Sequence, residues 1–169
     1  MSASKFLALV SGRIREIAAT VVSSGVSDDG KIVALDATGR LDTSVLPVGI
    51  GAETKQVQAS ESLNAGDVVN IWNSGGQFRV RKADATTSGK EATGFVLSAV
   101  TSGQTATVYL EGTITGLGGL LPGRMYLSTT PGAVTSTPPS GSGNVVQYVG
   151  NAVSTTEVSF ESSDGVILA

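Results

Sequence analysis

The sequence repeats one β-strand pattern along its C-terminal part. Residues 66–71 open the first copy with a glycine and an Asp-Val-Val-Asn-Ile run, and residues 123–128 open the second copy 57 residues later. Because short runs of this kind with glycine turns between them are typical of strands, the repeat predicts two similar sets of strands. The corresponding segments are 66–71 and 123–128, 74–76 and 130–132, 77–80 and 133–136, 92–96 and 148–152, and 107–111 and 157–161.

The same region predicts a mainly β domain over residues 52–169, built as a small duplicated barrel or sandwich. Val108 and Leu110 alternate with Thr107 and Tyr109, as side chains do in a strand with one buried face. Turn residues recur every ~8–12 positions, which is typical of these folds. We expect core packing for the aromatic residues Trp72, Phe78, Phe95, Tyr109, Tyr126, Tyr148 and Phe160, with a rim position that contacts a glycan or a partner as the other possibility for Trp72. The predicted strands are residues 54–59, 67–72, 77–82, 92–100, 105–111, 124–128, 133–136, 145–153 and 157–161.

The loop between the two copies, residues 112–123, combines five glycines with several aliphatic residues. An exposed apolar loop is normally an interface. The same residues could instead close one end of a barrel as a plug. The sequence leaves both interpretations open.

The composition argues against an enzyme. The chain has no cysteine and no histidine, which excludes the common nucleophile–base pairs and zinc sites. Glu111 and Glu161 occupy corresponding positions of the repeat, and we attribute this to duplication rather than to a catalytic pair. The formal net charge of −3 disfavours nucleic-acid binding. No stretch reaches the ~20 apolar residues that a membrane helix needs. We therefore expect no catalytic residue, metal, cofactor, nucleic acid or membrane.

Apolar residues at the N-terminus follow a helical spacing. They recur at intervals of three and four residues, which would place them on one stripe of a helix within residues 1–25. Gly12 interrupts the pattern at a cost of about 1 kcal/mol. The stripe could pack on the chain's own domain or on a partner. Its members are Leu7, Val10, Ile14, Ile17 and Val21.

Residues 26–51 predict an extended arm with short strands. Asp29-Gly30-Lys31-Ile32 is followed nine residues later by Thr38-Gly39-Arg40-Leu41, and each glycine occupies a turn position. The segment has no strong hydrophobic period, so we expect it to lie along another surface. The apolar residues available for contact are Ile32, Leu35, Leu41, Val45 and Leu46.

The segment from Asp36 to Pro47, together with the Gly-Lys-Ile motif before it, resembles a D-x-x-G-[KR]-[IL]-D-x-S-x-L-P pattern of tailed-phage virion proteins, fibre proteins among them. The domain that follows resembles phage capsid decoration, or cement, proteins. The resemblance runs from about residue 28 onward and depends on the order of the motifs, because each alone is a turn and a strand. The segments that carry it are residues 30–47, 63–70, 79–85, 93–96 and 145–152.

This resemblance implies a structural virion protein that binds the outer surface of a phage capsid as a homotrimer. It would stabilise the capsid by bridging neighbouring subunits of the major capsid protein. The expected contacts are the ten apolar residues of the predicted helix and arm. The alternative is a fibre or receptor-binding protein whose β-domain recognises a host surface glycan.

Overall fold

The computed structural model describes residues 5–46 and 51–169, and its chain divides into two compact units, residues 1–51 and 52–169. We call them the N-terminal unit and the β-domain. The described residues form strands and two short 3₁₀ helices and contain no α-helix. The mainly β fold is therefore confirmed, and the predicted N-terminal helix is wrong. Among the same residues, no helix has the length and apolar character needed to cross a membrane.

A β-hairpin takes the place of the predicted helix. Strands β1 (Lys5–Val10) and β2 (Arg13–Ala18) pair antiparallel around Ser11 and Gly12. Both turn residues have positive φ, 51° and 76°, as a type I′ turn requires. The glycine that is unfavourable inside a helix is therefore favourable here, because it adopts this backbone without strain.

The hairpin separates residues that the helical spacing had grouped together. Leu7 lies opposite Glu16 and Phe6 lies opposite Ile17 in the register of β1 and β2. Side chains alternate between the two faces of a strand, and opposite residues share a face. Leu7 and Ile14 are therefore on one face, and Val10 and Ile17 are on the other.

Turns built on aspartate side chains shape the remainder of the N-terminal unit. Asp36 Oδ1 accepts hydrogen bonds from the amides of Thr38 and Arg40 at 2.8 and 3.0 Å. The chain then returns to its earlier part, because the Ser23 amide donates to Ser44 Oγ at 2.7 Å. Residues 26–46 are thus looped back rather than fully extended, and residues 47–50 of the predicted arm lie outside the described ones. The 3₁₀ helices are η1 (Val26–Asp28) and η2 (Thr43–Val45).

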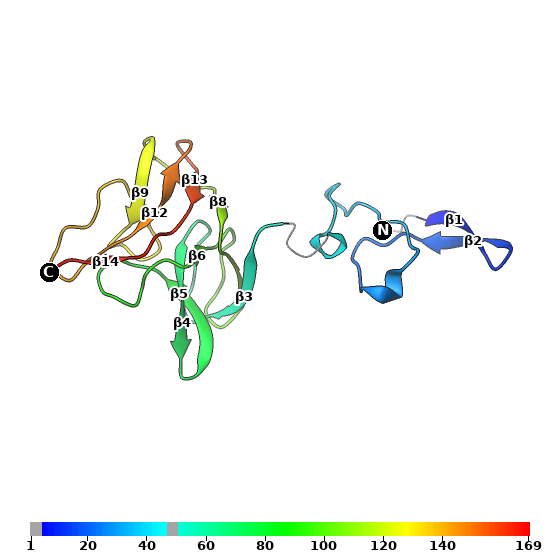
Figure 1. The fold of residues 1–169 in the computed structure, drawn as a ribbon, viewed down its shortest axis with the longest axis horizontal. Helices are drawn as coiled ribbons and strands as arrows, with labels where there is room; N and C mark the ends of the chain where they lie inside the picture. Colours follow the sequence, from blue (N-terminus) through cyan, green and yellow to red (C-terminus); the bar gives the residue numbers. More distant parts are fainter. Residues whose placement is uncertain (1–4, 47–50) are drawn as a thin grey trace. The chain divides into compact units, whose positions relative to one another are not determined.

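The first sheet of the β-domain is a closed five-stranded barrel (Figure 1). Its strands follow the order β3-β5-β4-β6-β7, and an antiparallel β3–β7 pair and a parallel β3–β5 pair complete the closure. The barrel strands are β3 (Thr54–Ala59), β4 (Val68–Ser74), β5 (Gln77–Lys82), β6 (Gly94–Phe95) and β7 (Thr105–Tyr109).

The second sheet has the same strand order without the closure. Its order β10-β9-β12-β13-β8 corresponds to β5-β4-β6-β7-β3 of the barrel. No pairing between β8 and β10 closes it within the described residues. The remaining pair joins β11 to β14. The bounds are β8 (Gly112–Ile114), β9 (Gly123–Leu127), β10 (Val134–Thr135), β11 (Val145–Val146), β12 (Tyr148–Ala152), β13 (Val158–Phe160) and β14 (Val166–Ile167).

Two glycines mark corresponding points of the two sheets. Gly94 pairs with Val69, and Gly150 pairs with Met125. The two glycines are 56 residues apart in the sequence, and so are their two partners. A Cβ at Gly94 would lie 2.5 Å from the Tyr109 carbonyl oxygen, and a Cβ at Gly150 would lie 2.0 Å from that of Ser159. In both sheets the neighbouring strand approaches so closely that only glycine fits.

The β-domain has two apolar cores. One fills the barrel and includes Val69 and Val80, and the other lies between the barrel and the second sheet. Val68 belongs to the second core, so consecutive residues of β4 are buried on opposite faces. Phe95 connects the sheets in this core, because it stacks on Tyr109 at 5.4 Å and contacts Phe160 at 5.3 Å between ring centroids.

Several side chains differ from the sequence-based expectation. Phe78 lies at the end of the β4–β5 hairpin and is 79% exposed, so it is not a core residue. In the loop between the repeats, Ile114 is buried in strand β8, and Leu117 packs partly against the core. Leu121 of the same loop is exposed. Part of this loop therefore packs in the core between the barrel and the second sheet, and part of it is exposed.

A candidate attachment surface on the N-terminal unit

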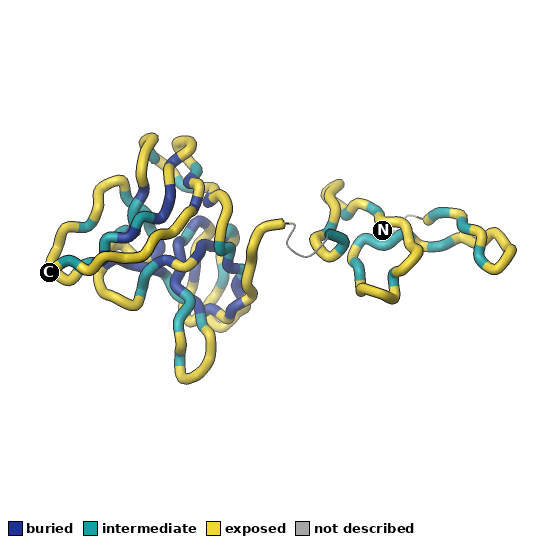
Figure 2. Tube along the Cα trace, in the orientation of Figure 1, coloured by how far each residue is buried: buried dark blue, intermediate teal, exposed yellow. Residues whose placement is uncertain are grey.

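The N-terminal unit orders its backbone without burying an apolar core. No residue from 5 to 46 belongs to the buried core of the chain, whereas the β-domain buries both of its clusters (Figure 2). Leu7, Leu9 and Ile14 are 73%, 73% and 74% exposed. An exposed group of large aliphatic side chains marks an interaction surface. We call the exposed large aliphatic side chains of residues 5–46 the attachment surface.

The structure places the predicted contact residues at different depths. Half of them are exposed, and these lie in both the hairpin and the following loops. The exposed residues are Leu7, Ile14, Ile32, Leu35 and Leu41. The half-buried residues are Val10, Ile17, Val21, Val45 and Leu46.

Sequence reasoning missed Leu9, together with Val22, Val26 and Val33. Leu9 lies opposite Ile14 across the hairpin and on the same face as Leu7. The Ser-Gly pair that follows the apolar run of residues 6–10 was the signal for the hairpin turn, and alternate residues of a strand share a face. The helical interpretation discarded that signal.

One face of the hairpin has no net formal charge, and we call it the neutral face. Lys5 Nζ lies 3.1 Å from Glu16 Oε1, so its two charges form an ion pair. Both side chains are about half exposed, at 48% and 56%, so the pair adds little stability. The neutral face consists of Lys5, Leu7, Leu9, Ile14, Glu16 and Ala18.

The opposite face carries two guanidinium groups, and we call it the cationic face. Arg13 lies across from Val10, and Arg15 lies across from Ala8. Neither arginine forms an ion pair within the part of the chain that the structure describes. The cationic face consists of Phe6, Ala8, Val10, Arg13, Arg15 and Ile17.

Three acidic residues of the loops, Asp28, Asp36 and Asp42, are engaged in local structure. Hydrogen bonds from Lys31 lower the pKa of Asp28, and those from Arg40 and Thr38 lower the pKa of Asp36. Hydrogen bonds from Ser44 likewise lower the pKa of Asp42, which caps η2. These carboxylates therefore stay ionised and hold the turns, which leaves the arginines of the cationic face available to another molecule.

Glu111 and Glu161 line one cavity of about 590 Å³ in the β-domain. Ala52, Leu110 and Phe160 supply apolar lining. No group of acidic residues suited to hold a metal is found in the described residues. The two carboxylates occupy corresponding ends of β7 and β13, which the shared strand order explains without a catalytic role.

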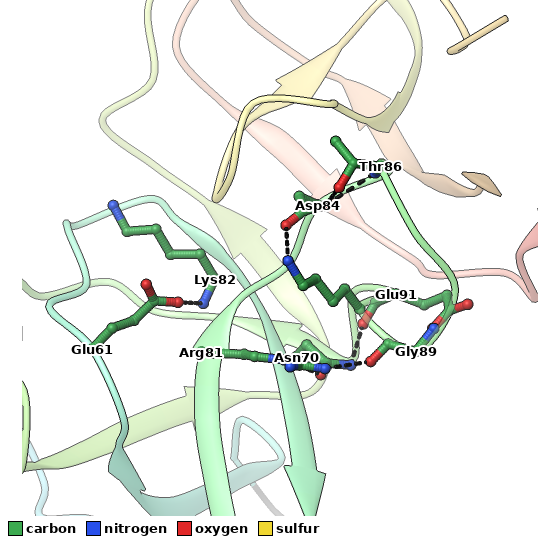
Figure 3. A network of polar contacts seen from close by, with 9 residues as sticks. Glu61, Asn70, Arg81, Lys82, Asp84, Thr86, Gly89 and Glu91 are labelled. Carbon is green, nitrogen blue, oxygen red and sulfur yellow. Dashed lines mark hydrogen bonds and ion pairs between the residues drawn. The ribbon is translucent and has the colours of Figure 1, made fainter. Parts of the chain in front are cut away.

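The surroundings of Trp72 bear on the alternative glycan-binding function. The Arg81 guanidinium carbon lies 4.5 Å from the centre of the indole ring, in cation–π range. Arg81 also donates hydrogen bonds to Asn70 Oδ1 at 3.0 Å and to the Gly89 carbonyl at 2.6 Å (Figure 3). One face of the ring is therefore covered by a fixed side chain, and that face is not open for stacking on a sugar.

A partly buried ion pair closes the loop between β5 and β6. Lys90 Nζ lies 2.9 Å from Asp84 Oδ2, and Thr86 donates its hydroxyl and amide to Asp84 Oδ1 (Figure 3). Burial alone would raise the pKa of Asp84, but the hydrogen bonds from Thr86 and Lys90 outweigh it and lower the pKa. This network cross-links residues 84–90 of the loop.

Comparison with protein-family models and with curated proteins finds no match for the sequence. Among solved structures, the chain is similar to the N base of the head fibre gp8.5 of bacteriophage phi29. The two share 12% sequence identity, and the similarity covers 66% of this chain and 95% of that one with a TM-score of 0.44. No family membership follows from a similarity of this size.

Proposed function

We propose that this protein is a structural component of a phage virion, in which the N-terminal unit attaches the β-domain to the outside of the capsid. The order of sequence motifs that resemble capsid decoration proteins supports the viral setting. The attachment surface supports the division of roles. Residues 52–169 form a body with its own cores, and residues 5–46 carry exposed aliphatic side chains that need a partner.

The observation that carries the proposal is an ordered segment without a core. Two-stranded hairpins are at best marginally stable in water. Each aliphatic side chain that moves from water into an interface contributes about 1.5–3 kcal/mol. A partner surface would therefore supply the burial that the N-terminal unit lacks, and neighbouring subunits of a major capsid protein would be bridged by its loops.

A trimer would strengthen such attachment. Three attachment surfaces held in one assembly engage a symmetric lattice together, and each later contact profits from a high effective concentration.

The matching strand orders of the two sheets and the corresponding glycines, Gly94 and Gly150, support an origin of the β-domain by duplication. In this proposal the β-domain arose by duplication, and the N-terminal unit binds it to the capsid.

The test compares the full chain with residues 52–169 for binding to phage capsids assembled without this protein. We expect the shorter chain to keep the thermal midpoint of the β-domain and to lose capsid binding. In the full chain, Leu35→Asp with Leu41→Asp should weaken binding, and Ala37→Asp, which adds a charge to the same exposed loop, is the control. A truncated chain that decorates capsids with unchanged affinity would refute the proposal.

A further inference from the structure

The two faces of the hairpin differ in charge, and this difference decides which face can meet a copy of itself. In an isologous contact the same patch of both subunits comes together. Two cationic faces would bring four guanidinium groups close to one another, and like charges that lie opposite are destabilising. Two neutral faces bring together equal numbers of opposite charges, because each contributes Lys5 and Glu16.

We propose that the neutral face of the hairpin packs on the neutral face of a second copy of this chain. The cationic face then points outward, with Arg13 and Arg15 available to an acidic surface. This contact has twofold symmetry, so it joins copies in pairs and is separate from the contacts that would hold the proposed trimer together. It holds whether or not the target of the assembly is a capsid.

The apolar content of the neutral face supports this occupant. Leu7, Leu9 and Ile14 are all nearly three-quarters exposed, and they lie together on one side of a two-stranded sheet. A second sheet laid on this side would create the two-layer arrangement in which sheets bury their apolar faces. The half-buried side chains of the cationic face, among them Val10 and Ile17, have less surface to bury.

The ion pair at one end of the neutral face also suits a second copy. Lys5 and Glu16 are exposed enough to exchange partners, so Lys5 of one copy can pair with Glu16 of the other. Opposite charges on facing strands stabilise a pair, and the exchange leaves no charge without a partner. The neutral faces of two copies are therefore complementary in charge.

Cross-linking tests which face lies between copies. The chain has no cysteine, so a single substitution introduces a unique thiol. Leu9→Cys places it on the neutral face, and Val10→Cys, one residue further along the same strand, places it on the cationic face. With a short bismaleimide at micromolar protein, we expect Leu9→Cys to form covalent dimers about tenfold faster, because assembly raises the effective concentration of the thiols. Equal rates, or a faster reaction at position 10, would overturn the proposal.

Sedimentation of full-length variants gives a second, independent readout. Leu9→Glu and Ile14→Glu should shift the chain toward smaller assemblies, and Val10→Glu should leave the mass of the assembly unchanged. The unfolding of the β-domain, followed in the same samples, shows that each variant is folded. A wild-type chain that stays monomeric, or assembly that survives both neutral-face substitutions, contradicts the proposal.

The outcomes separate this inference from the proposed function. A chain that assembles through the neutral face and does not bind capsids removes the function and leaves the inference standing. A chain that is monomeric in solution and still binds capsids removes the inference and leaves the function standing.

Discussion

The N-terminal unit and the β-domain are both built from strands and turns, but only the β-domain buries them. In the β-domain, Val68 and Val69 are completely buried although they are neighbours in sequence, because β4 has a core on each face. In the N-terminal unit, exposed and half-buried side chains alternate along β1, and neither face of this strand packs on a core of buried residues. Hydrogen bonding and turn geometry suffice to shape a segment, whereas burial is what makes it stable by itself.

The largest expected effect comes from filling a close approach between strands of the β-domain. Gly150→Ala should destabilise the domain by at least about 4 kcal/mol, because the new Cβ would lie 2.0 Å from the Ser159 carbonyl oxygen and the φ of 143° disfavours a side chain. Denaturant unfolding measures the loss. Gly118→Ala, which meets no atom within 4 Å, is the control and should stay near wild type. Equal stabilities would show that the second sheet is looser than described.

A matched pair of leucine truncations compares the two units directly. Leu127→Ala should cost about 2–5 kcal/mol, because Leu127 is 0% exposed in the shared core. Leu9→Ala should change the unfolding free energy of the β-domain by less than about 0.5 kcal/mol, since Leu9 is 73% exposed and lies in the other unit. Thermal and urea unfolding at low protein concentration give both values. A large effect of Leu9→Ala would remove the contrast between the units.

The Asp84 network predicts acid sensitivity of the β-domain. The pKa of Asp84 is lower in the folded protein than its ordinary value of about 3.9, so its contribution is present above that pH and is lost as the pH falls below it. Asp84→Asn should cost about 1–3 kcal/mol at neutral pH and should flatten the decrease in stability below about pH 4. Asp164→Asn, at an exposed position, is the control. An unchanged acid profile in Asp84→Asn would contradict this assignment.

The smallest effect concerns the hairpin turn. Gly12→Ala should destabilise the hairpin by about 1 kcal/mol, because alanine disfavours the positive φ there, and Ser11→Asn should stabilise it. Hydrogen exchange of the β1 and β2 amides should be about fivefold faster in Gly12→Ala. The amides of the β-domain provide an internal reference. Faster exchange in Ser11→Asn would argue against the type I′ turn.

The sequence predicted the strands best where local and long-range signals agreed. The predicted strands 54–59 and 77–82 match β3 and β5 residue for residue. The long predicted strand 92–100 is reduced to the two residues of β6, since Gly94 and Phe95 pair with β4 and only Phe95 also pairs with β7. At the N-terminus the helical and the strand patterns shared the same residues, and the turn at Ser11 and Gly12 decided between them.

The attachment surface could be predicted only in part. Apolar composition pointed to Leu7 and Ile14, but the assignment of residues to a face depends on whether the period is two or 3.6. Leu9 was missed for that reason. Arg81 of β5 lies over the ring of Trp72 of β4, and it is held there by a hydrogen bond to the Gly89 carbonyl in the following loop. No local sequence pattern predicts this arrangement, because its residues come from three different segments.

The core that the barrel shares with the second sheet makes the two repeats dependent on each other. Gln147 also connects the two repeats, because its buried side chain makes two hydrogen bonds with the backbone of Ala92. Its Oε1 accepts from the Ala92 amide at 2.7 Å, and its Nε2 donates to the Ala92 carbonyl at 2.9 Å. A chain cut between residues 115 and 121 should therefore give two fragments that do not fold separately and that refold when mixed. Changes in size at Phe95 and Phe160 would likewise have to occur together, because the two rings are in contact across the shared core.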